Sequence, residues 1–452
     1  MKAKQGSTIT DSLLTPQPYS TKEEKELTEE EFRSQFYKQR SMLLFICPFL
    51  LTALTFNGNA LLGAASKDMT KYFNKGKLNA SVQLSLSFSG LLAQIINSAF
   101  FLKVRHSTKM TLVAVVWTVA YIVYYFAFQI PNKDIGYWMA IGSNSVIGAF
   151  AAIGCNTVFG FLKAFPPGVI NGASSGIGFA GLSGSLSYIF MNSVLGMEMY
   201  WIALSLIPTF IAYVAIFFFL VSLKANIETK IHEAEAARGI HLDEDEASED
   251  EAEYQKTIEL SKEIHFEDVA DIEAKINNNL DIASVMNVVT SVGWMIFNIS
   301  AVYFLKYFCN HGVADRGTNS TVEEQDKTFI EKNAYALIHT AYHVGSFVGK
   351  TALTVVKPKY FEFTTLFIFA LTAFYSPAAY FQIVSTELQM VIMLAVGIGS
   401  GVNYCSCMYW LMASKSLKKE NKEVAITVSS FSNETAISSA MILAIGISYL
   451  LQ

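Results

Sequence analysis

Eleven stretches of the chain are apolar over about 20 residues, and this pattern limits the possible fold more than any other feature. Roughly 20 apolar residues are needed for a helix to cross the hydrocarbon core of a bilayer. Because lipid offers no partners for peptide groups, such stretches must be helical. The sequence therefore predicts an all-α polytopic membrane protein with about eleven transmembrane helices, at 42–65, 83–102, 111–130, 137–162, 169–195, 200–222, 285–308, 333–356, 363–381, 388–412 and 424–450.

Composition agrees with this prediction, because 52% of the 452 residues are hydrophobic and only 16% are charged. Soluble domains carry about a quarter charged residues. The spans fall into two groups, so we expect two bundles around a central cavity, an arrangement that favours a secondary transporter. The predicted parts are a cytosolic N-terminal tail (1–41), a first six-helix bundle (42–222), an acidic cytosolic loop (223–284) and a second five-helix bundle (285–452).

Small residues dominate one predicted span, where twelve of the sixteen residues from Gly172 to Ser187 are Gly, Ala or Ser. In a bilayer, small residues at four-residue spacing allow two helix backbones to approach closely. This helix is therefore predicted to pack tightly against its neighbours. The residues expected at its contacts are Gly172, Ser174, Ser175, Gly176, Gly178, Ala180, Gly181 and Gly184.

One glutamate and two lysines lie inside predicted spans, where a charge is costly and marks a functional site by default. Glu434 lies eleven residues into the last span, and a carboxyl group at that depth can load a proton or a cation. Lys350 and Lys306 can attract an anionic substrate, and one of them can neutralise Glu434 in the empty state. Both lysines are also near enough to helix ends to extend towards the membrane surface.

Further polar groups in the spans are candidates for a cavity lining. His339 and His343 are four residues apart and share one helix face, which suits cavity lining or proton transfer. Asn156 and Tyr404 add hydrogen-bonding groups, and the glycines from Gly397 to Gly401 are expected to loosen their helix near a binding site. We predict no cofactor, no metal site and no disulfide framework.

The loops carry signals for processing and partners. Two glycosylation sequons begin at Asn79 and Asn319, in loops that a cytosolic N-terminus places on the lumenal side. Eight of the eleven residues from Asp243 to Glu253 are acidic, which is typical of a solvated linker. Ser248 within it suits acidophilic kinases, and the loop is also a candidate site for trafficking proteins. No nucleic-acid partner is expected.

Several motifs, taken together, resemble the battenin family of lysosomal membrane proteins. The run FPPGVINGASSGIGFAGLSGSLSY is similar to the family's SSGTGxAGxxGxxSY stretch, and VYFLKYFCNHG is similar to its VYFAEYFINQG segment. AYHVGSFVGKTAL resembles its YQxGVFxSRSS helix, and GIGSGVNY and the stretch through Asn433 and Glu434 are similar to its last two helices. The matches occur in the family's order in both halves of the chain.

This resemblance implies a fold related to the major facilitator superfamily, in the membranes of lysosomes or vacuoles. It also implies roles in organelle pH, in basic amino-acid balance and in clearing glycerophosphodiesters. Lys350 stands where the family has Arg, and Glu434 where it has Asp. The chain departs from the family at Cys155, at Gly172 and Ala173, and at Lys306, which replaces a glutamate.

The sequence thus favours a transporter that exports a small polar or anionic metabolite, with a glycerophosphodiester first. Protons are the candidate coupling ion. One alternative is a nucleoside or sugar carrier, because equilibrative nucleoside carriers share this helix count. Another is a membrane scaffold that recruits trafficking proteins without transporting. An intramembrane enzyme is disfavoured, because the HExxH motif and the paired aspartates of membrane proteases are absent from the sequence.

Overall fold

The computed structural model describes residues 29–97, 104–162, 165–166, 168–237, 282–318, 328–352, 360–414, 417 and 421–450. Within these ranges all regular structure is helical, and eleven helices have 18 residues or more. The long helices of the first half are α3 (Ser41–Ala64), α5 (Asn79–Ile96), α6 (His106–Gln129), α7 (Lys133–Leu162), α8 (Val169–Ile189) and α10 (Ile207–Ala237). Those of the second half are α13 (Ile282–Tyr307), α16 (Ala334–Ala352), α17 (Glu362–Tyr380), α18 (Thr386–Ala413) and α19 (Asn421–Leu450).

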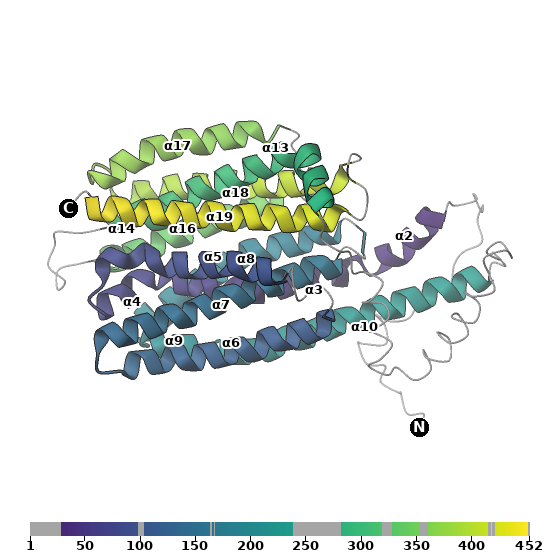
Figure 1. Cartoon of the computed structure of the whole chain (residues 1–452), viewed down its shortest axis with the longest axis horizontal. Coiled ribbons are helices and arrows are strands. Elements are labelled where there is room, and N and C mark those ends of the chain that lie inside the picture. The colour runs from purple at the N-terminus through teal and green to yellow at the C-terminus, as the bar shows by residue number, and fades with distance from the viewer. Residues whose placement is uncertain are drawn as a thin grey trace, which may run out of the picture.

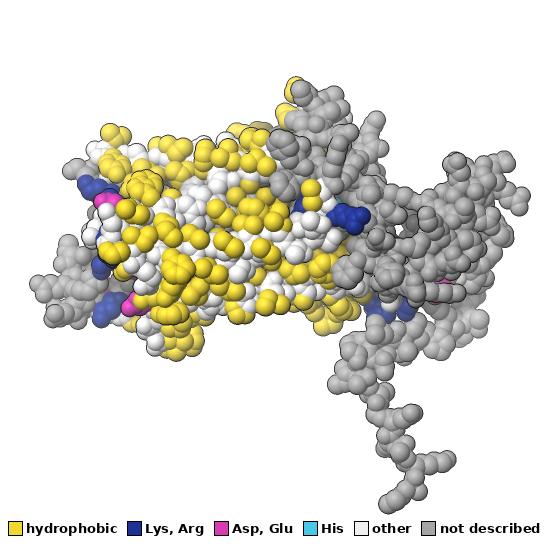
Figure 2. Space-filling model, turned by 60° about the horizontal axis from the view of Figure 1, so that its bottom comes forward, with side chains coloured by type: hydrophobic (Ala, Val, Ile, Leu, Met, Phe, Trp, Pro, Cys, Tyr) yellow, Lys and Arg dark blue, Asp and Glu magenta, His cyan; other side chains and the backbone are white. Residues whose placement is uncertain are grey.

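The outer surface matches a bilayer. Among the described residues, seven helical segments are long and apolar enough to cross a membrane. Large apolar side chains such as Ile211, Trp138 and Phe363 face outwards, where lipid can cover them. Figure 2 shows apolar side chains over the middle of the molecule, with charged side chains near its two ends. The chain is therefore an all-helical polytopic membrane protein, as predicted.

Four of the eleven long helices, α5, α8, α16 and α19, are not among those seven segments. Each contains many small or polar residues, which lower its apolar character. All four also contribute side chains to one internal cavity. Their lower hydropathy thus reflects their position around that cavity.

The helices form two halves that lie side by side (Figure 1). Within the first half α3 packs against α8, and within the second half α16 packs against α18. Contacts of α8 with α16 and of α5 with α19 join the halves. Short helices precede or connect the long ones: α2 (Glu29–Gln39), α4 (Ser66–Tyr72), η1 (Gly76–Leu78), η3 (Phe190–Val194), α9 (Met199–Leu204), η4 (Phe308–Val313), α14 (Ala314–Gly317) and α15 (Phe329–Lys332).

The two ends of the bundle differ. One end carries α4, α9 and α14 and is called the α4 end (Figure 1). At the opposite end α10 runs past the bundle to Ala237, so the predicted loop at 223–284 begins with about four turns of helix. The acidic run from 243 to 253 lies outside the described residues.

Buried aromatic rings fill the interior of the first half. Trp117 contacts Tyr213, with ring centroids 5.3 Å apart, and Tyr121 contacts Phe210 at 5.4 Å. The indole nitrogen of Trp117 donates a hydrogen bond to the carbonyl oxygen of Ile147 on α7 at 3.2 Å. These contacts bind α6, α7 and α10 to one another, away from the cavity.

Candidate functional site

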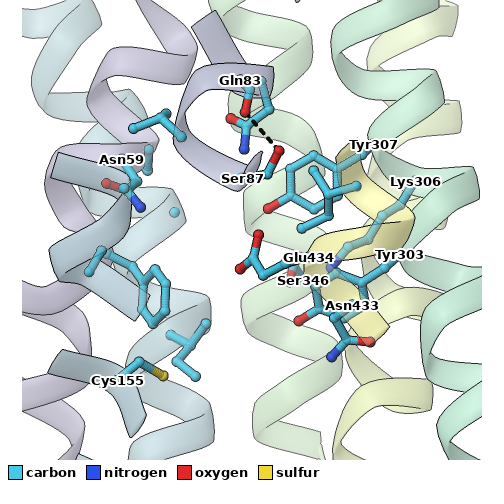
Figure 3. A pocket seen from close by; sticks show the side chains of 18 of the residues that line it. Asn59, Gln83, Ser87, Cys155, Tyr303, Lys306, Tyr307, Ser346, Asn433 and Glu434 are labelled. Carbon is cyan, nitrogen blue, oxygen red and sulfur yellow. Dashed lines mark hydrogen bonds between the residues drawn. The ribbon is translucent and has the colours of Figure 1, made fainter. Parts of the chain in front are cut away.

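A cavity of about 150 Å³ lies between the two halves (Figure 3). Its walls come from α3, α5, α7 and α8 of the first half and from α13, η4, α16, α18 and α19 of the second. A site between two rocking halves is where a transporter of this architecture binds its substrate. The polar side chains of its lining include Asn59, Gln83, Ser87, Gln94, Asn156, Asn310, Ser346, Ser430 and Asn433.

All six residues predicted as substrate or coupling sites line this one cavity. They come from five helices and are separated by up to 278 positions in the chain, counted from Asn156 to Glu434. The structure thus brings Lys306, Lys350 and Glu434 to a common space between the halves, together with His343, Asn156 and Tyr404.

Lys306 is held in a cage of aromatic rings. Its Nζ lies 3.4 Å from the ring centroid of Tyr303, 5.3 Å from that of Tyr307 and 6.0 Å from that of Tyr342. An ammonium over an aromatic face is attracted by the electrons of the ring. Only 4% of Lys306 is exposed, so it does not extend to the membrane surface, contrary to one sequence expectation.

Lys350 occupies the last turn of α16, and its Nζ lies 5.1 Å from the ring centroid of Tyr404 on α18. It is 5% exposed and likewise does not reach the membrane surface. Gly178 on α8 makes room for it, because a Cβ there would lie 3.2 Å from Cδ of Lys350 and 2.9 Å from Cα of Phe347. The lysine is therefore enclosed by both halves.

Glu434 projects from α19 towards α5 and the cavity (Figure 3). Its carboxyl carbon lies 3.6 Å from the position that a Cβ on Gly90 would take. Among the described residues, no ion pair of 4 Å or less joins it to Lys306 or Lys350. Its charge is thus available to the cavity.

Several amide atoms in the lining have no hydrogen-bond partner among the described residues. They are Nδ2 of Asn156, Oδ1 of Asn59, Oε1 of Gln94 and Oδ1 of Asn310. Buried polar atoms in native proteins are nearly always paired, so each exception calls for an explanation. Each of these atoms is fully buried, so a polar molecule in the cavity would reach it only after its side chain turns.

The predicted packing residues of α8 face two neighbours. Gly172, Gly176 and Gly184 lie against α3, where a Cβ would collide with the carbonyl oxygens of Phe45, Phe49 and Asn57. The hydroxyl of Thr52 adds a hydrogen bond to the carbonyl oxygen of Ala173 at 2.7 Å. Gly178 and Gly181 instead face α16, with Gly181 against His343. Ser174, Ser175 and Ala180 are buried with them.

The structure differs from two other expectations of the sequence analysis. The glycines from Gly397 to Gly401 do not loosen their helix, because α18 is continuous through them. Gly397 and Gly401 instead lie against the backbone of α16. Asn79 begins α5 and is only 3% exposed, so a glycan cannot reach it in this conformation, and Asn319 lies outside the described residues.

Sequence reasoning missed other residues of the lining, chiefly Tyr303, Tyr307, Asn59, Gln94 and His311. Tyrosine is common at membrane interfaces, and single amides inside spans carry little pattern. His311 lies three positions beyond the end of the predicted span at 285–308, so the span pattern gives no signal for it. Burial of His311 is the signal that only the fold supplies.

The chain matches a known protein family over most of its length. A model described as "CLN3 protein" matches residues 61–451, which is well over half the chain. The chain belongs to the CLN3 protein family. A curated relative of this family, Battenin from Dictyostelium discoideum, is 22% identical over 371 residues, covering 81% of this chain and 85% of the relative. The resemblance seen in the motifs is thereby confirmed.

Solved structures show which fold this CLN3 family member has. The proton:xylose symporter XylE of the major facilitator superfamily matches with a TM-score of 0.55 at 10% identity, over 91% of this chain and 96% of that one. A bacterial homologue of the iron transporter ferroportin, in an outward-facing state, also matches with a TM-score of 0.55, at 11% identity, over 90% and 92% of the two chains. The predicted fold similar to the major facilitator superfamily is confirmed.

Proposed function

We propose that this protein is a secondary transporter of lysosomal or vacuolar membranes that exports a small anionic metabolite, with a glycerophosphodiester as the first candidate. Transport would also support the pH and the amino-acid balance of the organelle. Membership of the CLN3 family and the fold of known transporters support this class of function. The substrate is argued from the cavity.

The charge of the cavity lining carries the proposal. Among the described residues of the lining, Lys306 and Lys350 are accompanied by one carboxylate, Glu434, which leaves one formal positive charge. A buried charge without a partner is costly, so an anion that balances it is bound favourably. A phosphodiester carries one negative charge and several acceptor oxygens for charge-assisted hydrogen bonds. In the empty cavity, Glu434 would balance one of the lysines.

The unpaired amides favour a substrate that has donors as well as acceptors. Nδ2 of Asn156 can donate to an oxygen, while Oδ1 of Asn59 and Oε1 of Gln94 can accept from hydroxyl groups. A glycerol group attached to a phosphodiester offers both kinds of atom. A simple inorganic anion would leave the two acceptors unpaired.

The test is a transport assay on full-length protein in liposomes, with isotope-labelled glycerophosphoglycerol as the probe. Lys350→Ala should lower uptake about 10-fold or more, because a hydrogen bond to a charged group contributes about 1.5–3 kcal/mol. Lys350→Arg should keep most of the activity, since Arg carries the same charge at the family's position. Lys224→Ala is the matched control, because Lys224 is a buried lysine on α10 outside the cavity lining.

Competition separates the rival substrates in the same assay. Inhibition by other glycerophosphodiesters but not by nucleosides or sugars would support the proposal. Normal uptake by Lys350→Ala would refute the role of that lysine. Uptake that only nucleosides or sugars inhibit would reassign the substrate, and no uptake of any probe would favour the scaffold function at the acidic loop.

A further inference from the structure

Three histidines meet at the part of the cavity nearest the α4 end. His339 and His343 lie on α16 with ring centroids 4.5 Å apart, and His311 of η4 lies with its ring centroid 4.9 Å from that of His339. All three line the cavity, and His311 and His339 are almost fully buried. In the described part of the chain, no three His, Cys, Asp or Glu side chains are placed to hold a metal ion.

The two histidines of α16 share a hydrogen bond that needs one proton between them. Their Nε2 atoms are 3.0 Å apart, a distance typical of hydrogen bonds. A bond between two ring nitrogens exists only when one of them carries hydrogen and the other does not. The protonation states of His339 and His343 are therefore linked to each other.

Asn310 decides which histidine donates. Its Nδ2 lies 2.7 Å from Nδ1 of His339. When the amide nitrogen donates there, Nδ1 must be bare, so neutral His339 has its hydrogen on Nε2 and donates to His343. His343 then carries its own hydrogen on Nδ1, which faces Gly181 on α8. In this arrangement both rings are neutral.

The same amide is also suited to the protonated form. Oδ1 of Asn310 is buried and has no hydrogen-bond partner among the described residues. A half-turn of the amide brings Oδ1 towards Nδ1 of His339, where it can accept a hydrogen bond from an added proton. Asn310 can therefore complement His339 both before and after it gains a proton on Nδ1.

The surrounding charges link this proton to an anion. Lys306 and Lys350 would repel a protonated His343, and Glu434 is the one carboxylate among the lining residues that the structure describes. Other groups around the rings include the tyrosines Tyr307, Tyr335 and Tyr342, the glycines Gly63 and Gly181, and the backbone of Ala60. A bound anion would offset the lysines, and by linkage a proton on the histidines would strengthen anion binding equally.

A chain of polar groups leads from the histidines to the α4 end. Nδ1 of His311 lies 3.2 Å from the hydroxyl of Tyr335, which accepts a hydrogen bond from Ser66 at 3.2 Å. Ser66 is the first residue of α4. Ser66 and Tyr335 are both buried, so this chain leads from His311 towards the α4 end without reaching the surface there.

We propose that His339, His343 and Asn310 form a proton-binding site that takes up one proton together with the anionic substrate. The proton binds Nδ1 of His339 while the amide of Asn310 turns from donor to acceptor, and no covalent bond to a heavy atom breaks. The coupling to an anion rests on the proposed function, whereas the proton site itself does not. Transport would then be driven by a proton gradient.

Nitrogen NMR on full-length protein with ¹⁵N-labelled histidine in liposomes tests the site without any substrate. The wild type should show a coupling across one N–H···N hydrogen bond between two histidines, and His343→Gln should abolish it. On acidification, an imidazolium signal should appear at clearly lower pH in Asn310→Leu than in the wild type, because Leu cannot accept the hydrogen bond. His106→Gln, in a histidine of α6 outside the cavity lining, should change neither signal.

Proton uptake on adding glycerophosphoglycerol tests the coupling. A pH-sensitive dye should report about one proton taken up per wild-type protein and far less by Asn310→Leu and His343→Gln. The proton site would be overturned if the wild type showed no coupling between the two histidines. It would also be overturned if the variants gave the same NMR signals and the same proton uptake as the wild type. The NMR signals with no proton uptake by the wild type would uphold the site and refute its coupling to this substrate, while the liposome uptake assay shows separately whether glycerophosphoglycerol is transported.

Discussion

At the scale of single residues, the charge of Lys306 is expected to help bind the substrate while it lowers the stability of the fold. An isolated charge inside a protein is costly, and here the aromatic cage of Tyr303 offsets only part of that cost. Replacement of Lys306 by Met keeps the length of the side chain and removes the charge. We expect uptake of an anionic glycerophosphodiester to fall about 10-fold and the melting temperature to stay equal or rise.

Thermal unfolding in detergent and uptake in liposomes, measured on the same Lys306→Met preparation, check this prediction. Lys224→Met is the control, because Lys224 lies outside the cavity lining. It forms an ion pair with Glu228 in which nitrogen and oxygen are 3.4 Å apart. A lower melting temperature with unchanged uptake would mean that Lys306 serves the fold rather than the substrate.

Residue chemistry explains which parts of the site could be predicted. Lys350, Lys306 and Glu434 stand out in sequence because a charge in an apolar span needs a reason. Their meeting in one cavity could not be predicted, since it depends on how α13, α16 and α19 pack. The role of Asn310 is harder still to predict, because it depends on a contact with His339, which lies 29 residues away in the chain.

At the scale of helices, close packing of α8 on α3 is the feature most sensitive to substitution. A Cβ on Gly176 would collide with the backbone oxygen of Phe49 and with the hydroxyl of Thr52. Gly176→Ala should therefore lower stability by about 1–3 kcal/mol, since overpacking forces helices apart. Gly142→Ala on α7 is the matched control, because nothing lies within 4 Å of its Cβ position. Thermal unfolding should separate the two; equal melting temperatures would contradict the tight contact.

The sequence predicts one of the two glycine-rich interfaces and misreads the other. On α8 the small residues follow one another in a single run, so their spacing is visible. Gly345 on α16 and Gly397 on α18 form an equivalent contact, each against the backbone of the other helix. They are 52 positions apart, so Gly397 alone suggested a loosened helix. A helix contact shared by two distant segments has no local signature.

At the scale of the whole molecule, several polar contacts between the halves lie at the α4 end. Lys67 pairs with Asp315 at 3.3 Å and donates a hydrogen bond to Thr318 at 2.9 Å. Ser193 of η3 bonds Asn333, which precedes α16. These bonds hold the α4 end together, so in the proposed transporter a rocking of the halves would have to break them to admit a molecule from that side.

Lys67→Ala should therefore shift the protein towards the state that is open at the α4 end. A partly exposed ion pair contributes about 0.5–1 kcal/mol, which corresponds to a shift of about 2- to 5-fold in the population of the open state. Cys155 lines the cavity and reports on access, so its labelling by a membrane-impermeant thiol reagent from the α4 side should accelerate by that factor.

Two further variants make this test decisive. Lys75→Ala removes an ion pair with Asp134 of 2.6 Å that lies within the first half, so it should leave the labelling rate unchanged. Exchange of the charges, Lys67→Asp with Asp315→Lys, should restore the slow rate, because the pair across the halves is formed again. If Lys67→Ala labels no faster than Lys75→Ala, the contact does not hold the halves together. If the exchanged pair still labels fast, the lysine acts through Thr318 and its other neighbours rather than through the ion pair with Asp315.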